Sequence, residues 1–261
     1  MLLKLIKCKP LLNNVLCILI SSLILFSPQA GRAAEPAAPT DEKVYEQAVV
    51  AADHPLASAA GLAILKAGGN VVDAAVATSF ALTVLRPASC GLGGGGFMVI
   101  WNAKDQKATV IDYRERAPAA ATPDMYAMLP GTDKQRQLAS RQGPLAVAVP
   151  CTVAGLSYAV KEYGTLDLKT VMLPAIQLAR RGVPINEHMR SVQKGMLARI
   201  KNGTLNPDEF KTLVDEYLNH GKPWKEDARF FSPQLKTLEL IAEYGRDGFY
   251  RGAVAEAMVA A

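Results

Sequence analysis

The feature that most constrains this fold is the segment VVDAAVATSFALTVLRP, residues 71–87, which is apolar on nearly every side. It is too short for a membrane span, and it is interrupted by Asp73, Thr78 and Ser79. A helix that is apolar all round is a buried one, because every face needs another element to cover it. We therefore predict a buried helix that stops before Pro87, since the residue preceding a proline disfavours helical backbone.

The residues before this helix carry their own signals. Asn70 is placed to cap its start, with Asp73 adding a negative charge to the first turn. Residues 55–67 predict an earlier helix that begins at a proline and ends at two glycines. A short apolar run, residues 48–52, indicates a buried strand before that helix.

A glycine-rich stretch, GLGGGG at residues 91–96, has the G-x-G-x-x-G spacing of dinucleotide-binding folds. In those folds the glycines follow a strand and open a helix. Here they follow the predicted helix and precede two strand-like runs, residues 97–102 and 107–118, which flank a polar turn and predict a β-hairpin. We therefore interpret the stretch as a helix-to-strand corner, where the backbone packs closely or takes positive φ, and not as a nucleotide site.

The second half of the chain is predicted to be mostly helical. Three expected helices have a polar start and a glycine stop: Thr152 with Gly164, Asp167 with Gly182, and Ser232 with Gly245. A further helix begins after Gly252 and is still apolar at Ala261, which we interpret as truncation in mid-helix.

The N-terminal residues have the order of a secretory signal peptide. Three lysines precede an apolar run from Leu16 to Phe26, and small residues follow, which predicts cleavage after Ala33. We therefore expect a signal peptide at residues 1–33, a linker at 34–43 and a partial domain at 44–261, in the periplasm or secreted, without a stable membrane anchor. The alternative is an uncleaved anchor, although the run is short of the roughly 20 residues that a span needs.

The charge balance argues against a nucleic-acid partner. The chain has 29 Lys and Arg against 24 Asp and Glu, a net charge of +5. Removing residues 1–33 removes Lys4, Lys7, Lys9 and Arg32 and no acidic residue, so the mature net charge is +1. Phosphate binding needs a basic surplus that the mature chain lacks.

Few residues suit metal binding or the common hydrolase mechanisms. We interpret His54 as a capping residue, and His188 and His220 as solvated. Cys90 and Cys151 are interpreted as small buried residues, although an oxidising compartment would let them pair. No H-E-x-x-H, C-x-x-C or G-x-S-x-G motif is present, so no metal, no cofactor and no serine or cysteine nucleophile is expected.

Charged side chains that could bind a ligand are most concentrated in the segment DYRERAP. Alternation along a strand places Asp112, Arg114 and Arg116 on one face and Tyr113 and Glu115 on the other. One interpretation is an edge strand with solvated charges. The other is an arginine held by a neighbouring acid, which offers its fork to a substrate carboxylate.

Three stretches resemble the opening of the large subunit of γ-glutamyltranspeptidases: HPLASAAGLAILKAGGNVVDAAVATSFALTVLRP, GLGGGGFMVIW and IDYRERAPAAATPDMY. AVPCTVAGLSYAVKEYG and LPAIQLARRGVPIN continue the match, which covers about residues 44–261. The resemblance implies an N-terminal-nucleophile hydrolase, whose four-layer αββα sandwich is made as a precursor and cut autocatalytically into two subunits. The fold class expected here is α/β of the α+β type, an incomplete αββα sandwich with a helix-rich second half.

The resemblance also implies roles for two residues. Arg114 matches the arginine of the family's RE.AP motif, which binds the α-carboxylate of the glutamyl group, and Glu115 is the acid expected to orient it. Arg116 stands where the family usually has an uncharged residue, so it keeps the solvated interpretation. Cys151 replaces a glycine usual in the family's PGT.AG turn.

In this family the nucleophile is a threonine freed at the start of the small subunit, with its own α-amino group as base. The Thr-Thr-His segment that carries it is absent here, because no histidine follows a threonine. We therefore expect no catalytic residue in this chain, whose nucleophile lies outside it, and no activity from the chain alone.

The expected function is that of an exported γ-glutamyltransferase and glutathione hydrolase, with glutathione and other γ-glutamyl compounds as donors. Acceptor amino acids or water take the γ-glutamyl group, and the small subunit from the same precursor is the protein partner. The alternatives are a cephalosporin or glutaryl acylase of the same fold, or a non-catalytic carboxylate-binding relic.

Overall fold

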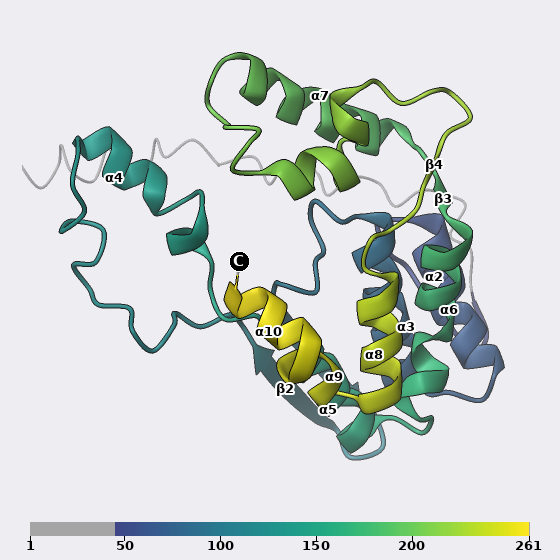
Figure 1. The fold of residues 1–261 in the computed structure, drawn as a ribbon. Coiled ribbons are helices and arrows are strands. Elements are labelled where there is room, and N and C mark those ends of the chain that lie inside the picture. Colours follow the sequence, from purple (N-terminus) through teal and green to yellow (C-terminus); the bar gives the residue numbers. More distant parts are fainter. Residues whose placement is uncertain (1–44, 261) are drawn as a thin grey trace, which may run out of the picture. The chain divides into compact units, whose positions relative to one another are not determined.

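The computed structural model describes residues 45–260, and its helices and strands lie in the unit that begins at Val49. The predicted signal peptide and linker, residues 1–43, lie outside the described residues. In chain order (Figure 1) the elements are α2 (Pro55–Lys66), α3 (Val71–Leu85), β1 (Gly96–Asn102), β2 (Lys107–Tyr113), α4 (Asp133–Ala139), η1 (Pro144–Ala146), α5 (Thr152–Tyr163), α6 (Leu168–Arg181), β3 (Val183–Pro184), α7 (Glu187–Lys201), η2 (Leu213–Tyr217), η3 (Asn219–Gly221), β4 (Arg229–Phe230), α8 (Leu235–Tyr244), α9 (Asp247–Tyr250) and α10 (Gly252–Ala260).

Helix α3 is surrounded by other helices, since α2, α5 and α6 all contact it. The side chains of Val76, Phe80 and Val84 are fully buried, which confirms the predicted buried helix. Burying a side chain of this kind contributes about 1.5–3 kcal/mol. Helix α6 also packs against α8, so α2, α3, α6 and α8 contribute to one continuous hydrophobic core.

The start of α3 is fixed by the predicted cap. Asn70 Oδ1 accepts hydrogen bonds from the backbone N–H groups of Val72 (2.8 Å) and Asp73 (3.1 Å), and Asp73 Oδ2 accepts one from the Asn70 N–H (2.9 Å). The buried Asp73 carboxylate also accepts from the backbone N–H (2.9 Å) and the hydroxyl (2.7 Å) of Thr165. One acidic residue thereby ties the start of α3 to the connection between α5 and α6.

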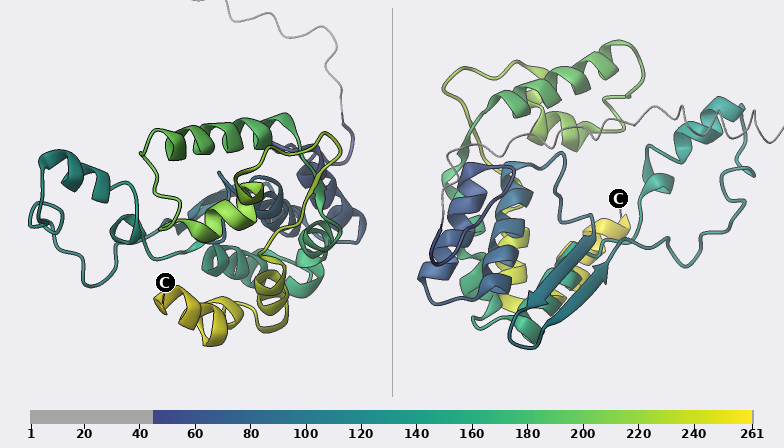
Figure 2. Two further views of the ribbon diagram at one scale, coloured as in Figure 1. Left: turned by 45° about the horizontal axis from the view of Figure 1, so that its top comes forward. Right: turned by 180° about the vertical axis from the view of Figure 1, so that it is seen from behind.

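Strands β1 and β2 form the predicted antiparallel hairpin, with Gly96 opposite Tyr113 and Val99 opposite Val110. We call the side that bears Met98, Ile100 and Ile111, and packs on the core, its inner face. The outer face carries large apolar side chains that are all more than half exposed, namely Phe97, Val99, Trp101 and Val110. The right-hand view of Figure 2 shows the hairpin in front of the helices, with no other described element over its near side.

The glycines at 91–96 form the predicted corner between α3 and β1. Close packing is the reason for the glycine at Gly95, because an added Cβ would clash with the Tyr113 carbonyl oxygen and lie 2.8 Å from the Glu115 nitrogen. Gly93 has nothing within 4 Å of such a Cβ. None of the six corner residues has positive φ, so close packing is the one of the two predicted reasons that applies here.

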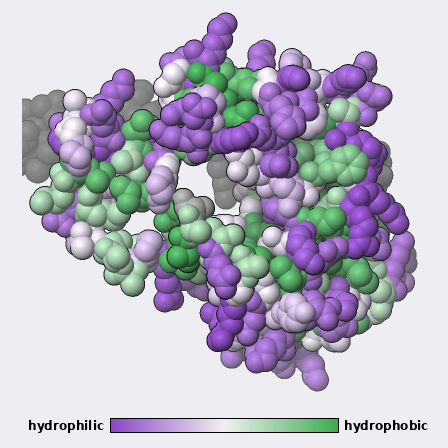
Figure 3. Space-filling view, in the orientation of Figure 1, coloured by the Kyte–Doolittle hydropathy of each residue, from purple (hydrophilic) through white to green (hydrophobic). Residues whose placement is uncertain are grey.

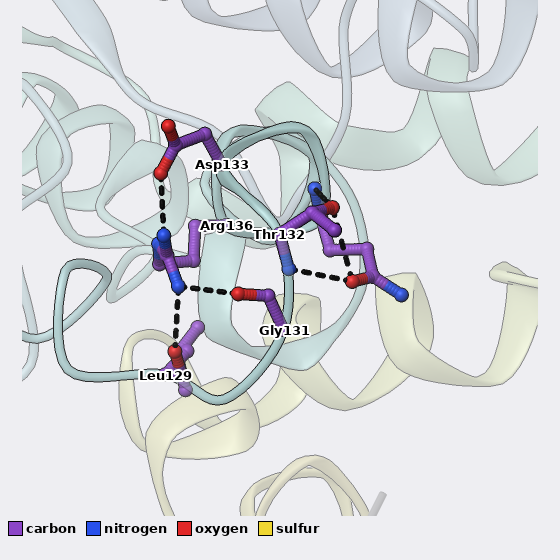
Figure 4. A network of polar contacts seen from close by, with 6 residues as sticks. Leu129, Gly131, Thr132, Asp133 and Arg136 are labelled. Atoms are coloured by element: carbon purple, nitrogen blue, oxygen red, sulfur yellow. Dashed lines mark hydrogen bonds and ion pairs between the residues drawn. The ribbon is translucent and has the colours of Figure 1, made fainter.

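Residues 117–148 leave the hairpin as a long excursion that carries α4 and η1 (Figure 1). A capping box between Thr132 and Gln135 starts α4, which buries none of its residues. Arg136 holds the preceding turn, because its Nη1 donates to the carbonyls of Leu129 (3.3 Å) and Gly131 (2.5 Å), as Figure 4 shows. The excursion is therefore ordered by local contacts more than by a core of its own.

The later helices have the predicted glycine stops, and α5 and α6 begin as predicted, whereas α8 begins at Leu235, three residues after Ser232. Asp167 caps α6 through the Thr170 N–H (2.9 Å), and the glycines at 164, 182 and 245 follow α5, α6 and α8. A short antiparallel pair, β3 with β4, was not predicted. Hydrophobic residues of α10 are exposed (Figure 3), among them Met258 and Val259.

The predicted strand at residues 48–52 is wrong, because this stretch has irregular backbone. Both sheets within residues 45–260 consist of two strands, and neither includes this stretch. Val50 packs instead against α2 at Gly61. The mixed helix and sheet content confirms the α+β class, and no helix within residues 45–260 is long and apolar enough to cross a membrane.

Candidate functional site

The two predicted site residues lie directly after β2. Arg114 and Glu115 are in contact, with 3.4 Å between Arg114 Nε and Glu115 Oε2. The Arg114 side chain is 69% exposed and that of Glu115 is 30% exposed, so the cation faces solvent and the carboxylate is partly buried. The structure thus places an exposed guanidinium beside a half-buried carboxylate.

The backbone around this pair is held on both sides. The Asp112 carboxylate accepts a hydrogen bond from the Arg114 N–H (2.9 Å). The Glu115 carboxylate lies beside the corner, where a Cβ on Gly95 would be 2.9 Å from Glu115 Oε2. The predicted alternation is confirmed, because Asp112, Arg114 and Arg116 are exposed while Tyr113 and Glu115 are half-buried, although the strand itself ends at Tyr113.

A turn from a distant part of the sequence closes the same corner. The Gly94 carbonyl accepts hydrogen bonds from the N–H groups of Cys151 (2.8 Å) and Thr152 (2.9 Å), and the Arg116 carbonyl accepts one from Val149 (2.8 Å). Cys151 has φ −128°, which any residue adopts. Its replacement of the family's usual glycine therefore introduces no backbone strain.

An open depression of ≈ 660 Å³ lies beside Arg114. The residues that line it include Asp112, Arg114 and Arg116 from the end of the hairpin, Tyr158 from α5, and Arg246, which directly precedes α9. Figure 1 shows α5, α9 and β2 next to one another. The site is therefore basic, with three guanidinium groups and one carboxylate on its surface.

Tyr250 joins α9 to this site. Its hydroxyl donates to the Pro150 carbonyl (2.9 Å) and accepts from the Ala154 N–H (3.2 Å), and the Arg246 guanidinium lies 5.2 Å from the centre of its ring. Sequence reasoning missed Arg246 and Tyr250, because tertiary folding alone brings α9 to the start of α5. No motif around residues 245–250 could have identified them.

Two phenols at the site stay neutral near physiological pH. Burial raises the pKa of Tyr113, which lies against Gly155 of α5, and burial also raises the pKa of Tyr250. Both side chains therefore stay uncharged and leave the positive charge to the arginines.

The remaining polar candidates lie elsewhere. His54 caps α2, because its Nδ1 accepts from the Leu56 N–H (3.1 Å), and His188 and His220 are exposed, as predicted. Cys90 and Cys151 are both free thiols, and the prediction that they are buried was wrong, since each is half-exposed in a turn. Within residues 45–260, no three His, Cys, Asp or Glu side chains gather as a metal site requires.

Comparison with known proteins supports the resemblance. The family model described as Gamma-glutamyltranspeptidase matches residues 57–261. The chain is 37% identical over 254 residues to a glutathione hydrolase proenzyme of Bacillus subtilis, and the match covers 94% of this chain and 42% of that protein. The chain thus spans about two fifths of the length of this curated relative.

Solved structures agree. The crystal structure of Helicobacter pylori γ-glutamyltranspeptidase is similar with a TM-score of 0.72 and 36% identity, over 83% of this chain and 60% of that chain. A cephalosporin acylase from Bacillus halodurans is similar with a TM-score of 0.71 and 30% identity, over 87% of this chain and 42% of that chain. The predicted N-terminal-nucleophile hydrolase fold class is confirmed.

Proposed function

Because this chain belongs to the γ-glutamyltranspeptidase family, we propose that it supplies the γ-glutamyl-binding part of a γ-glutamyltransferase and glutathione hydrolase. The observation that carries the proposal is the contact between Arg114 and Glu115 beside an open depression. A guanidinium has five N–H donors, and the Glu115 contact uses its Nε. The outer edge of Arg114 is therefore available for a bidentate contact with an α-carboxylate.

In this proposal the residues of this chain bind and orient, and the bond-breaking group comes from the small subunit. Arg114 fixes the α-carboxylate of the donor, and Glu115 restricts where the guanidinium points. The γ-amide carbon is then placed for attack by the small-subunit threonine, whose α-amino group accepts its proton. The new ester bond forms as the amide C–N bond breaks, and the amine or peptide leaves with the proton taken from the threonine hydroxyl. Water or an acceptor amino acid then attacks the acyl-enzyme, takes the γ-glutamyl group and returns a proton to the threonine oxygen.

The outer face of the hairpin supports a partner from the same precursor. Sheets with apolar side chains on both faces are covered on both faces, and the outer face leaves Phe97, Val99, Trp101 and Val110 exposed. Exposed apolar patches of this kind mark interaction surfaces. The small subunit, released by autocatalytic cleavage, is the proposed cover, and the N-terminal signal sequence supports a periplasmic or secreted location.

The test is Arg114→Ala in the precursor that carries this chain. Hydrogen bonds to charged groups contribute about 1.5–3 kcal/mol each, so KM for γ-glutamyl-p-nitroanilide should rise at least tenfold. Release of p-nitroaniline measures the rate. Arg251→Ala is the matched control, because Arg251 is exposed, pairs with Asp247 and does not line the depression. An unchanged KM for Arg114→Ala would return Arg114 to the class of solvated charges.

The cephalosporin acylase structure supports a second candidate, an acylase for glutaryl amides. Glutaryl and γ-glutamyl donors share the carboxylate that Arg114 would bind and differ by the α-amino group. Rates with glutathione and with a glutaryl amide separate the two enzymes. Binding of L-glutamate without turnover of either donor would favour the non-catalytic alternative.

A further inference from the structure

The depression beside Arg114 holds more positive charge than the proposed role of Arg114 uses. Arg114, Arg116 and Arg246 line it together with one acid, Asp112. Asp112 already accepts the Arg114 N–H. Neither Arg116 nor Arg246 has an ion pair with any of the residues 45–260. A ligand held by Arg114 therefore lies in a depression with further guanidinium groups that are not paired with an acidic side chain.

Arg246 is the better placed of the two, because its surroundings restrict it. The acid next to it in sequence, Asp247, is engaged by Arg251 at 3.3 Å. The Arg246 guanidinium lies over the Tyr250 ring, and two hydrogen bonds fix the hydroxyl of that ring to the start of α5. A guanidinium that rests on an anchored ring loses less freedom on binding an anion than one on a mobile side chain.

Arg246 lies where two depressions adjoin, whereas Arg114 lines only one of them. Arg246, Tyr158 and Ala154 line both the depression of ≈ 660 Å³ and a neighbouring one of ≈ 600 Å³. Each is within the range of about 300–1,000 Å³ that is usual for small-molecule sites. A donor whose α-carboxylate lies on Arg114 has room to extend its leaving group towards Arg246.

We propose that Arg246 is a specificity-determining residue that binds a second carboxylate, at the end of the leaving group. The favoured substrates are γ-glutamyl peptides with a free C-terminal carboxylate, in preference to γ-glutamyl compounds with an uncharged leaving group. The proposal rests on the proposed function, because it takes Arg114 as the receptor for the α-carboxylate.

The experiment uses two donors of nearly equal size, γ-glutamylglycine and γ-glutamylglycinamide, which differ in one carboxylate. The ratio of their kcat/KM values in the precursor measures the preference for the charged leaving group. Arg246→Gln should lower this ratio about tenfold, as expected for the loss of one contact with a charged group. Arg246→Lys should retain part of the ratio. Arg180→Gln is the matched control and should leave it unchanged, because Arg180 is exposed, pairs with Glu239 and lines neither depression. Added salt should lower the wild-type ratio and have less effect on the ratio of Arg246→Gln.

A ratio that is the same in wild type and in Arg246→Gln would overturn the proposal. An equal loss for both donors would do so too, because it would indicate a structural role alone. Turnover of γ-glutamyl-p-nitroanilide, and its dependence on Arg114, tests the proposed function separately. If the precursor turns over no donor, titration calorimetry of the two donors against the protein gives the same ratio as affinities, and equal affinities in wild type would overturn the proposal.

Discussion

Helix α3 and the β1–β2 hairpin have the same kind of sequence, apolar on both sides, and they differ in how completely the chain covers them. Phe80 in α3 is 0% exposed, whereas Val99 on the outer face of the hairpin is 70% exposed. Helices α2, α5 and α6 all contact α3, while α5 contacts the hairpin at β2. Apolar residues on a face indicate that this face is buried in the assembled protein. For the outer face of the hairpin we infer that the residues that bury it lie beyond residues 45–260.

The comparison is tested most directly by shortening one apolar side chain to alanine in each region. Phe80→Ala should lower the free energy of unfolding by about 3–5 kcal/mol, because it removes a fully buried ring and leaves a cavity. Val99→Ala on the outer face should change it by about 1 kcal/mol or less, since most of that side chain is already in water. Urea denaturation of the chain followed by circular dichroism measures both. Equal losses would mean that the outer face is covered after all.

The corner that connects the two regions should be sensitive at one glycine and tolerant at another. Gly95→Ala should destabilise the chain by about 1–3 kcal/mol, because the added Cβ meets rigid backbone at Tyr113 and Glu115. Gly93→Ala is the control and should stay within about 0.5 kcal/mol, since its Cβ would meet nothing. Thermal unfolding measures both variants. A larger loss for Gly93→Ala than for Gly95→Ala would contradict close packing as the reason for glycine here.

An isosteric change tests the missing cover itself. Val99→Thr keeps the shape of the side chain and replaces one methyl group with a hydroxyl. Stability of this chain should change by about 0.5 kcal/mol or less, and stability of the precursor should fall by about 1–3 kcal/mol, because the hydroxyl would be buried without a hydrogen bond. Denaturation of the two proteins under the same conditions gives the comparison. A precursor that tolerates the hydroxyl would place the outer face in solvent.

The smallest expected effect is a pH dependence where α2 begins near the end of α3. Burial, followed by the positive charge of Arg86, lowers the pKa of His54 below its ordinary 6.5. The unfolded chain therefore binds a proton at higher pH than the folded chain, and stability should fall as pH decreases from about 6.5 towards the folded pKa. His54→Asn retains a capping group and removes the titration. Denaturation midpoints between about pH 7 and pH 5 should fall less for this variant than for wild type.

Predictions from the sequence were accurate where the signal depends on residues close together in the chain. Asn70 and Asp73 identified the start of α3, because a cap depends on residues three apart. The hairpin followed from two alternating runs around a polar turn. Residues 48–52 were mistaken for a strand, because a short apolar run looks the same whether a sheet edge or a helix covers it.

The site residues also differ in how local their sequence signals are. Arg114 and Glu115 are neighbours in a motif, so the sequence was sufficient to select them as candidates. The resemblance favours the carboxylate-binding interpretation, which stays a prediction. Arg246 reaches the same depression through the packing of α9 on the start of α5, mediated by Tyr250. That contact joins segments about a hundred residues apart in the chain, and no local pattern encodes it.

The hydrogen bond between Arg116 and Val149 brings the two ends of the excursion together next to the site. A protease cut anywhere within residues 117–148 would therefore leave Arg114 and the Cys151 turn side by side, as two chains in place of one. The site therefore does not depend on the length or sequence of the excursion. Evolution can lengthen, shorten or redecorate it, and an experimenter can insert a label into it, without moving the residues that we propose to bind substrate.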